Sequence, residues 1–412
     1  MSVLANREKS FDFVCVGGAT QDVFVRSDAS KILTLSDLRE ERRLLAFEYG
    51  GKISVEHIEF TTGGGATNAA VSLARLGALA AFLGKVGPDE IGQLIIKELA
   101  DNGVDITYHL HSDTHFTGYS VILTSYEGDR TVLTHRGANT MITAEEIDWS
   151  FIGRAGWLYV TSLGGESARL LDPLVERASA AGVKVALNPG STQLRGGIDK
   201  LRPVLEKTEV LLLNKEEAAL LTGTTPVRDV IVEERCALCG QCIKACPKNV
   251  FVRDHDRIVA AALERCSKCG KCVLACSTGA MVMEPWAFNV ADSFEALCRT
   301  GPKVVVITDG ANGAQACDGR TVCLLPATEV PVVSSLGAGD AFGSGFVFEY
   351  SRSGDIGRSL ALGTANAASV VQVVGAKNGL LDAKEGEAAL KGYDPKALRT
   401  QALAELLAAA RK

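Results

Sequence analysis

Two runs of four cysteines constrain this sequence more than any other feature. Both runs have the spacing C-x2-C-x2-C-x3-C and consist of Cys236, Cys239, Cys242 and Cys246, then Cys266, Cys269, Cys272 and Cys276. They hold eight of the 12 cysteines in the chain. Disulfide frameworks are typical of small secreted domains, whereas this chain has 412 residues. Such dense clustering therefore indicates metal ligation.

The spacing of the cysteines matches what a cubane iron–sulfur cluster requires. Three closely spaced thiolates cover three corners, and the chain must cross over to supply the fourth. The pattern predicts one [4Fe–4S] cluster on Cys236, Cys239, Cys242 and Cys276 and a second on Cys266, Cys269, Cys272 and Cys246. The alternatives are a disulfide knot or structural zinc, which prefers paired CxxC units. The segment resembles bacterial two-cluster ferredoxins, except that Ser277 stands where proline is usual.

Outside this segment, glycine-punctuated apolar strands alternate with helical patterns. Expected strands include residues 11–16, 81–86 and 304–308, and expected helices include 66–76 and 91–102. This alternation predicts an α/β fold with a mostly parallel sheet and helices on both faces. The cysteine-rich segment interrupts it, so we expect an inserted α+β domain at residues 231–284. Residues 1–230 and 285–412 then form one domain around it.

A glycine-rich turn is the first candidate site outside the cysteine segment. Gly337, Ala338, Gly339 and Asp340 follow an expected strand at residues 330–333 and enter a helix. Small residues let amides at a helix start approach a phosphate, whose charge the helix dipole favours. An aspartate there can accept a proton from an attacking hydroxyl while the amides hold the transferring group. The alternative is a structural turn with an N-cap aspartate.

Three further polar stretches lie where strands end or helices begin. Residues 62–70 open a helix in which Asn68 can offer its amide to a ligand. Residues 214–217 and 308–314 each follow a strand, at the edge where open α/β sheets bind ligands. The sequence contains no GxxxxGK[ST] motif, which excludes a P-loop kinase.

Together these four stretches resemble the ribokinase-like carbohydrate kinases, the PfkB family, over about residues 11–230 and 285–385. The resemblance implies a doubly wound ribokinase-like fold with a small β lid at about residues 23–60, which shields the sugar from water. It also implies an ATP-dependent kinase that uses Mg²⁺ and phosphorylates a hydroxyl of a sugar or nucleoside.

The resemblance further implies roles for individual residues. Asp340 is similar to the catalytic base, and Gly337, Ala338 and Gly339 are similar to the anion hole. The implied substrate contacts are Asp22, Gly64, Gly65 and Asn68. The implied contacts to nucleotide or Mg²⁺ are Asn214, Glu217, Thr308, Gly310 and Asn366.

One departure from the family pattern concerns a monovalent cation. The family often has Asp-Thr-x-Gly-Ala-Gly-Asp, whereas this chain has Ser334, Ser335 and Leu336 before the glycine-rich turn. The missing aspartate commonly helps to bind the cation. Activation by K⁺ is therefore in doubt, although the base and the anion hole are retained.

Charge and hydropathy limit the classes of partner that this chain is expected to bind. The formal net charge is −6, charges of both signs are dispersed, and no run of 18 apolar residues occurs. We therefore expect neither nucleic acid nor a membrane as a partner. The first residues lack the apolar core of a secretory signal, so a cytoplasmic location is expected. The expected partner is a small-molecule sugar or nucleoside, with a redox partner protein and a homodimer left open.

The clusters are not needed for phosphoryl transfer, because that reaction moves no electrons. In one hypothesis, the insert makes an active kinase respond to redox state. In a second, the clusters are only structural or dock an electron-transfer partner. In a third, the kinase body is a catalytically silent scaffold for an electron carrier. Retention of Asp340, Asn214 and Glu217 argues against the third.

Overall fold

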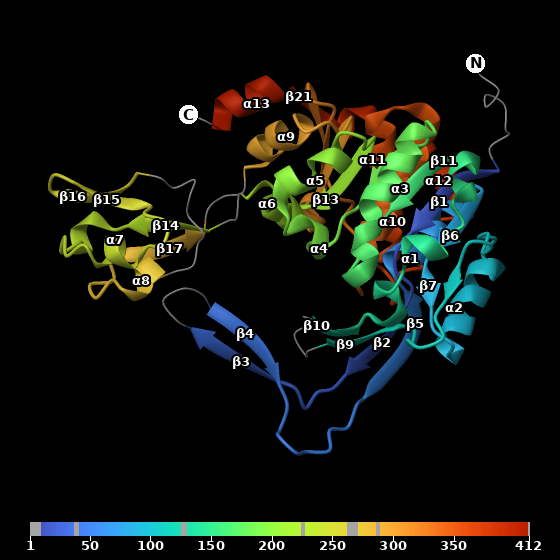
Figure 1. Ribbon diagram of the computed structural model, residues 1–412, viewed down its shortest axis with the longest axis horizontal. Helices are drawn as coiled ribbons and strands as arrows, with labels where there is room; N and C mark the ends of the chain where they lie inside the picture. Colours follow the sequence, from blue (N-terminus) through green and yellow to red (C-terminus); the bar gives the residue numbers. More distant parts are fainter. Residues whose placement is uncertain are drawn as a thin grey trace.

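The computed structural model describes residues 10–36, 41–124, 130–223, 227–261, 271–285 and 289–410, and a nine-stranded sheet forms the centre of its main body (Figure 1). The strands, from one edge to the other, are β21 (Arg399–Ala402), β20 (Thr321–Leu325), β19 (Ala314–Cys317), β18 (Val304–Thr308), β13 (Val210–Asn214), β12 (Lys184–Leu187), β11 (Ala155–Val160), β1 (Phe11–Val16) and β6 (Ala80–Leu83). The strands from β18 to β6 are parallel, and β19 to β21 extend the sheet in antiparallel fashion. The predicted α/β fold with a mostly parallel sheet is confirmed.

Helices cover both faces of the sheet because its strands bury side chains on both. In β1, Val14 and Val16 belong to one hydrophobic cluster, and Phe13 and Cys15 belong to the other. The first cluster includes side chains from α3 (Leu171–Ala180), α4 (Ser191–Leu194), α5 (Gly197–Leu205), α6 (Lys215–Thr222), α9 (Val290–Cys298) and α13 (Leu403–Ala410). The second includes side chains from α1 (Gly65–Arg75), α2 (Glu90–Asp101), α10 (Ala338–Ser353), α11 (Ile356–Val370) and α12 (Ala383–Gly392). Across the described part of the chain, none of the helices is both long and apolar enough to cross a bilayer.

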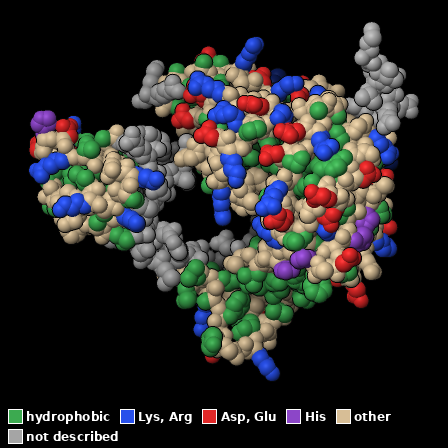
Figure 2. Space-filling model, viewed as in Figure 1, with side chains coloured by type: hydrophobic (Ala, Val, Ile, Leu, Met, Phe, Trp, Pro, Cys, Tyr) green, Lys and Arg blue, Asp and Glu red, His purple; other side chains and the backbone are tan. Residues whose placement is uncertain are grey.

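A second sheet forms the lid. Its strands lie in the order β10 (Arg130–His135), β9 (Gly118–Thr124), β2 (Thr20–Arg26) and β5 (His57–Gly63), and a hairpin of β3 (Lys31–Ser36) and β4 (Glu41–Ala46) extends from it (Figure 1). The predicted lid at residues 23–60 thus omitted β9 and β10. Two short strands, β7 (Lys85–Val86) before α2 and β8 (Leu110–His111) after it, pair in parallel. Hydrophobic side chains gather on the exposed surface of the lid in Figure 2. The lid strands β5 and β10 carry exposed hydrophobic residues, among them Ile58, Phe60 and Leu133.

The cysteine-rich segment is a separate small unit. Its first strand, β14 (Val227–Ile231), pairs antiparallel with its last, β17 (Met281–Pro285). Between them lie α7 (Gln241–Ala245), the hairpin of β15 (Phe251–Asp254) and β16 (Arg257–Ala260), and α8 (Lys271–Leu274). Figure 1 shows this unit to one side of the nine-stranded sheet, and it has its own hydrophobic core. Because β14 and β17 pair with each other at the two ends of the segment, we infer that the insert comprises residues 227–285.

The strand expected at residues 330–333 is wrong. Pro331 has no amide hydrogen to donate to a sheet. The amides of Val333 and Ser334 instead donate to the carbonyl of Val371, at the end of α11, at 2.8 and 3.1 Å. The segment before the glycine-rich turn is therefore anchored to a helix end rather than to the sheet.

Candidate active site

The N-termini of helices α1 and α10 meet at one place. The side-chain amide of Asn68 donates to Oδ2 of Asp340 at 2.8 Å. One turn further along each helix, the hydroxyl of Ser344 donates to that of Ser72 at 2.7 Å. Since both helices run in the same direction from these contacts, their positive ends converge near Asp340. An anion placed there is stabilised by both helices.

The turn before α10 depends on a glycine. Gly337 caps the helix with φ of 80°, in the left-handed region. A Cβ atom at this position would lie 2.6 Å from the Cα atom of Ala376, so the two backbone segments are in close contact. The first amides of α10 have no carbonyl partner one turn earlier in the helix. Amides at such a helix start can donate to an anion.

Replacing Gly337 with alanine is expected to lower Tm by several degrees. The left-handed conformation alone costs an L-residue roughly 1–2 kcal/mol, and overlap with Ala376 adds to it. Gly339→Ala is the matched control, because a Cβ atom there meets no atom within 4 Å. Thermal unfolding should separate the two variants. Equal Tm values would show that the close approach at Gly337 is not a constraint.

A cavity of about 220 Å³ lies at the start of α10. The residues that line it are Asn188, Leu212, Leu213, Asn214, Glu217, Thr308, Gly337, Gly339, Asp340, Phe342 and Gly343. It contains residues from three of the polar stretches singled out in the sequence, at the carboxyl ends of β13 and β18 and at the start of α10. The topology thus brings together side chains that are far apart in the chain, at the sheet edge where α/β folds bind ligands.

The environment of Asp340 suits a general base. The residue keeps a partly exposed surface. Burial by the surrounding protein raises the pKa of Asp340 to about 6; the Asn68 amide and Lys377 oppose this rise, and the negative charge of Asp22 adds to it. A carboxylate that titrates near neutral pH can accept a proton under physiological conditions.

Three of the predicted substrate contacts, Asp22, Gly64 and Asn68, lie in buried or tightly packed positions. Burial is the main cause that raises the pKa of Asp22, which receives hydrogen bonds from Ser120 and Thr20. A Cβ atom at Gly64 would lie 2.7 Å from the carbonyl carbon of Gly18, so only glycine fits there. Oδ1 of Asn68 is buried and, within the described ranges, has no hydrogen-bond partner. This oxygen can therefore accept a hydrogen bond from a bound hydroxyl.

Gly65 begins α1 and also lies in a tight position. A Cβ atom there would lie 3.0 Å from the Cβ atom of Thr161, at the end of β11. The glycine-rich stretch thus lets the chain pass close to β11 before it enters the helix that carries Asn68.

Asn214 and Glu217 form a capping box at the start of α6. The Asn214 side chain accepts from the Glu217 amide at 2.8 Å, and Oε2 of Glu217 accepts from the Asn214 amide at 2.9 Å. Burial raises the pKa of Glu217, as do the neighbouring charges of Asp340 and Glu216, against the hydrogen bond from Asn214. Carboxylates that share a cavity fit a hard divalent cation, so Glu217 could hold Mg²⁺ through Oε1.

Two predicted nucleotide contacts, Gly310 and Asn366, are not among the residues that line this cavity. Gly310 lies in the turn after Thr308 with φ of 50°, and only Thr308 lines the cavity. Asn366 is fully buried between α1, α10 and α11. Its amide donates to Ser72 and to the carbonyl of Ala341, and its oxygen accepts from the Leu381 amide. The described polar atoms of Asn366 are thus engaged in the core, and its contact with a nucleotide stays a prediction.

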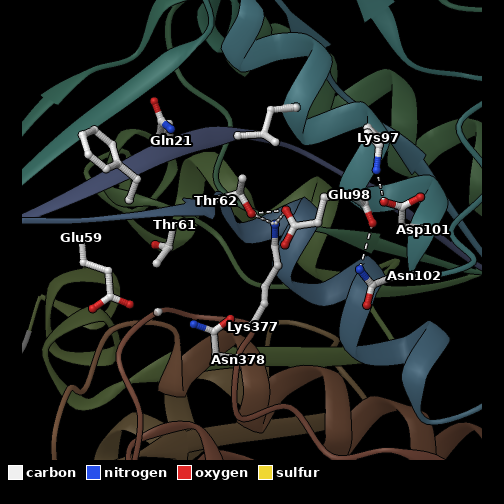
Figure 3. Close-up of a pocket in the computed structure, with 13 residues that line it drawn as sticks. Gln21, Glu59, Thr61, Thr62, Lys97, Glu98, Asp101, Asn102, Lys377 and Asn378 are labelled. Atoms are coloured by element: carbon white, nitrogen blue, oxygen red, sulfur yellow. Dashed lines mark hydrogen bonds and ion pairs between the residues drawn. The ribbon is translucent and has the colours of Figure 1, made fainter.

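The sequence analysis missed Lys377, which lies in the loop after α11 and is only 3% exposed. It borders a second cavity, of about 440 Å³, between α2 and the lid strand β5 (Figure 3). The only sequence signal is a lysine inside the glycine-rich run of residues 375–379. That signal alone does not separate a buried lysine from a solvated one.

The described cysteines of the insert surround its small core. Cys242 and Cys272 are buried in that core, and Cys236, Cys246 and Cys276 pack against it. The Val250 amide donates to Sγ of Cys246 at 3.4 Å, and the Met281 amide donates to Sγ of Cys276 at 3.3 Å. Amide donors of this kind stabilise cluster-bound thiolates. Cys266 and Cys269 lie outside the described residues, and Cys239 is exposed.

The arrangement of these thiols fits a cluster. Burial raises the pKa of Cys242, and the nearby Cys236 and Cys276 also contribute, so three predicted ligands of the first cluster are neighbours.

Sequence comparisons find two known families in this chain. The pfkB family of carbohydrate kinases matches residues 31–255 and 286–383, and a 4Fe–4S dicluster domain matches residues 235–281. An uncharacterized sugar kinase of Archaeoglobus fulgidus is 23% identical over 314 residues, which cover 75% of this chain and 98% of the relative. An ATP-dependent ribose-1-phosphate kinase of Halopiger xanaduensis is 25% identical over 331 residues, 80% of this chain and 87% of the relative.

Solved structures show the same fold. Arabidopsis thaliana ribokinase, complexed with ribose and ATP, superposes with a TM-score of 0.63 and 21% identity, covering 93% of this chain and all of its own. The nucleoside kinase of Methanocaldococcus jannaschii gives a TM-score of 0.62 and 17% identity, covering 94% of this chain and all of its own. With the family match over most of its length, the chain belongs to the pfkB family of carbohydrate kinases, phosphotransferases with an alcohol acceptor, and carries a ferredoxin-type domain.

Proposed function

We propose that the protein transfers the terminal phosphoryl group of ATP to a hydroxyl of a sugar or nucleoside. The observation that carries this proposal is the convergence of Asp340, the first amides of α10 and Glu217 on one cavity. Asp22 and Asn68 hold the acceptor. Asp340 takes the proton of its reacting hydroxyl, and the amides after Gly337 stabilise the transferring group. Bound Mg²⁺ supplies charge neutralisation for the phosphates, and Asn214 and Glu217 would hold it.

The acceptor is best identified by a screen of ADP release. Anaerobically purified protein is mixed with ATP, Mg²⁺ and single sugars, sugar phosphates or nucleosides. Ribose 1-phosphate, ribose and nucleosides come first, since relatives and fold neighbours are named for them. A signal above the ATPase background that requires Asp340 supports the proposal. Absence of transfer to every acceptor would reject it.

The pH dependence of turnover should report Asp340. Because its pKa is raised to about 6, the carboxylate is ionised above that pH and protonated below it. Only the ionised form accepts a proton, so kcat/KM should fall below pH 6 and level off above it. Steady-state kinetics between pH 5 and pH 8 will measure this limb. A profile that stays flat down to pH 5 would argue against Asp340 as the base.

We also propose that the iron–sulfur insert makes turnover respond to cluster state. The insert leaves the body after α6 and returns just before α9, where Asn289 caps the helix. These two helices flank β13 and β18, whose ends carry Asn214 and Thr308. Lys215 of α6 also pairs with Asp309 of the nucleotide turn at 3.1 Å. A shift of the insert therefore acts on two elements that border the nucleotide site.

Comparing three states of one preparation tests this coupling. Turnover is measured with the clusters reduced, oxidised and removed, at matched protein concentration and with folding of the body checked by circular dichroism. Different rates support coupling. Identical rates in all three states would leave the clusters as structural elements or as a docking site for an electron-transfer partner.

A further inference from the structure

Lys377 is a buried cation beside the proposed transfer site that has no role in the chemistry described so far. Its Nζ donates to the Thr62 hydroxyl at 2.8 Å and to Oε2 of Glu98 at 3.1 Å (Figure 3). The Thr62 hydroxyl in turn donates to the same Glu98 carboxylate. Three side chains from three elements thus form a closed hydrogen-bonded group.

This group connects the two halves of the site. Thr62 lies in β5, directly before the glycine-rich stretch that leads to Asn68. Lys377 follows Ala376, whose backbone is in close contact with Gly337 in the phosphate-binding turn. The carbonyl of Lys377 also accepts from Nη1 of Arg75 in α1 at 2.8 Å. Displacing Lys377 would therefore move both the acceptor side and the phosphate side.

The charges around Lys377 come from five elements. The charges of Glu98 in α2, Asp22 in β2 and Arg75 in α1 influence the pKa of Lys377. The charge of Lys377 in turn lowers the pKa of Asp340 in α10. Glu59 of β5 and Lys97 and Asp101 of α2 line the outer part of the cavity. Burial lowers the pKa of Lys377, while Glu98 and Asp22 favour its charged form.

The burial of the Lys377–Glu98 pair is unequal. The side chain of Lys377 is 3% exposed and that of Glu98 is 29% exposed. Water in the cavity of about 440 Å³ can therefore screen Glu98 more than Lys377. The charge of Lys377 favours the ionised form of Asp340, whereas the charge of Asp22 opposes it.

Building on the proposed kinase activity, we propose that Lys377 is a positioning residue of the transfer site. Its ammonium ties the substrate loop to the phosphate-binding turn and balances the negative charges of Asp22 and Asp340. Removing it makes Asp340 a base that ionises only at higher pH, because Lys377 is the cation that opposes the rise of its pKa.

The variants Lys377→Met and Lys377→Met with Glu98→Gln test the proposal. The double variant leaves no unpaired charge among Lys377, Thr62 and Glu98. It can therefore be measured even if the single variant does not fold. We expect the acid limb of kcat/KM to move up by about one pH unit, which is a loss of about fivefold at pH 6 that approaches about tenfold at pH 5 and is recovered above pH 8. Lys97→Met is the matched control, because Lys97 lines the same cavity with a 74% exposed side chain. It should leave the limb in place.

The outcomes separate the two proposals. A shifted limb in the double variant, with an unshifted Lys97→Met control, supports the role of Lys377. An unshifted limb in a folded double variant overturns it, since the lysine then serves only to pair with Glu98. A loss of activity that is equal at every pH and is accompanied by a lower Tm also overturns it, because damage to the fold would act this way. Absence of transfer by the unmodified protein would instead reject the kinase function.

Discussion

Asp340→Asn is expected to lower kcat by about 10²–10⁴-fold, which is the contribution of a positioned general base. Asparagine keeps the shape of the side chain and an oxygen that can accept from Asn68, so the contact between α1 and α10 is preserved. It cannot take the proton of the acceptor hydroxyl. The variant should therefore bind ATP and acceptor with near-normal Kd while releasing almost no ADP.

The stability of this variant provides a control. Burial and Asp22 raise the pKa of Asp340 from 3.8 to about 6, so the folded state holds its proton more tightly than the unfolded state. The ionised carboxylate therefore destabilises the fold as the pH rises through that window. Asparagine removes this cost, and Tm at pH 7.5 should equal or exceed that of the unmodified protein. A variant with unchanged kcat would refute the assignment of the base.

The second large effect is expected from the insert. Below about 70–80 residues a hydrophobic core seldom suffices alone, and metal binding then supplies folding free energy. The core of this unit contains Cys242 and Cys272 among few apolar side chains. Replacing both cysteines with serine should abolish the visible cluster absorbance. The same change should expose the peptide bonds between β14 and β17 to protease, while the kinase body stays resistant.

Single variants resolve the number of clusters. Cys242→Ser and Cys272→Ser should each remove about four iron atoms of about eight, because the two residues are assigned to different clusters. Cys323→Ser, a buried cysteine in β20 of the kinase body, is the control and should keep all of the iron. Complete loss of iron from either single variant would show that the cysteines do not divide as proposed. An insert that resists protease without iron would contradict its dependence on the clusters.

The sequence predicted the elements whose signals are local. Residues 11–16 and 304–308 form strands as expected, because continuous apolar runs bounded by glycine or polar residues favour buried strands. The turn at Gly337 is also local, since a left-handed residue at a helix start requires glycine. The contact between Asn68 and Asp340 could not be derived from local signals, because 272 positions separate the two residues.

The sequence is insufficient where a contact depends on distant neighbours. Asn366 stands in a helical pattern that fits either a ligand contact or a core contact, and only the packing of α1 against α10 reveals its hydrogen bonds in the core. The apolar run at residues 330–333 looks like a strand, but Pro331 has no amide hydrogen and the amide of Val333 donates to the end of α11 instead of to a sheet. Lys377 reads as an ordinary loop lysine. Its burial arises from β5 and α2, which precede it by hundreds of residues.

The antiparallel ribbon of β14 and β17 has an evolutionary consequence. Because the first and last strands of the unit are hydrogen-bonded neighbours, the chain departs and returns at nearly the same point. A short turn could replace the whole cassette without stretching the polypeptide on either side. Ancestral kinases could therefore have acquired this module in a single recombination event, and engineers could transplant it into other enzymes at the equivalent junction.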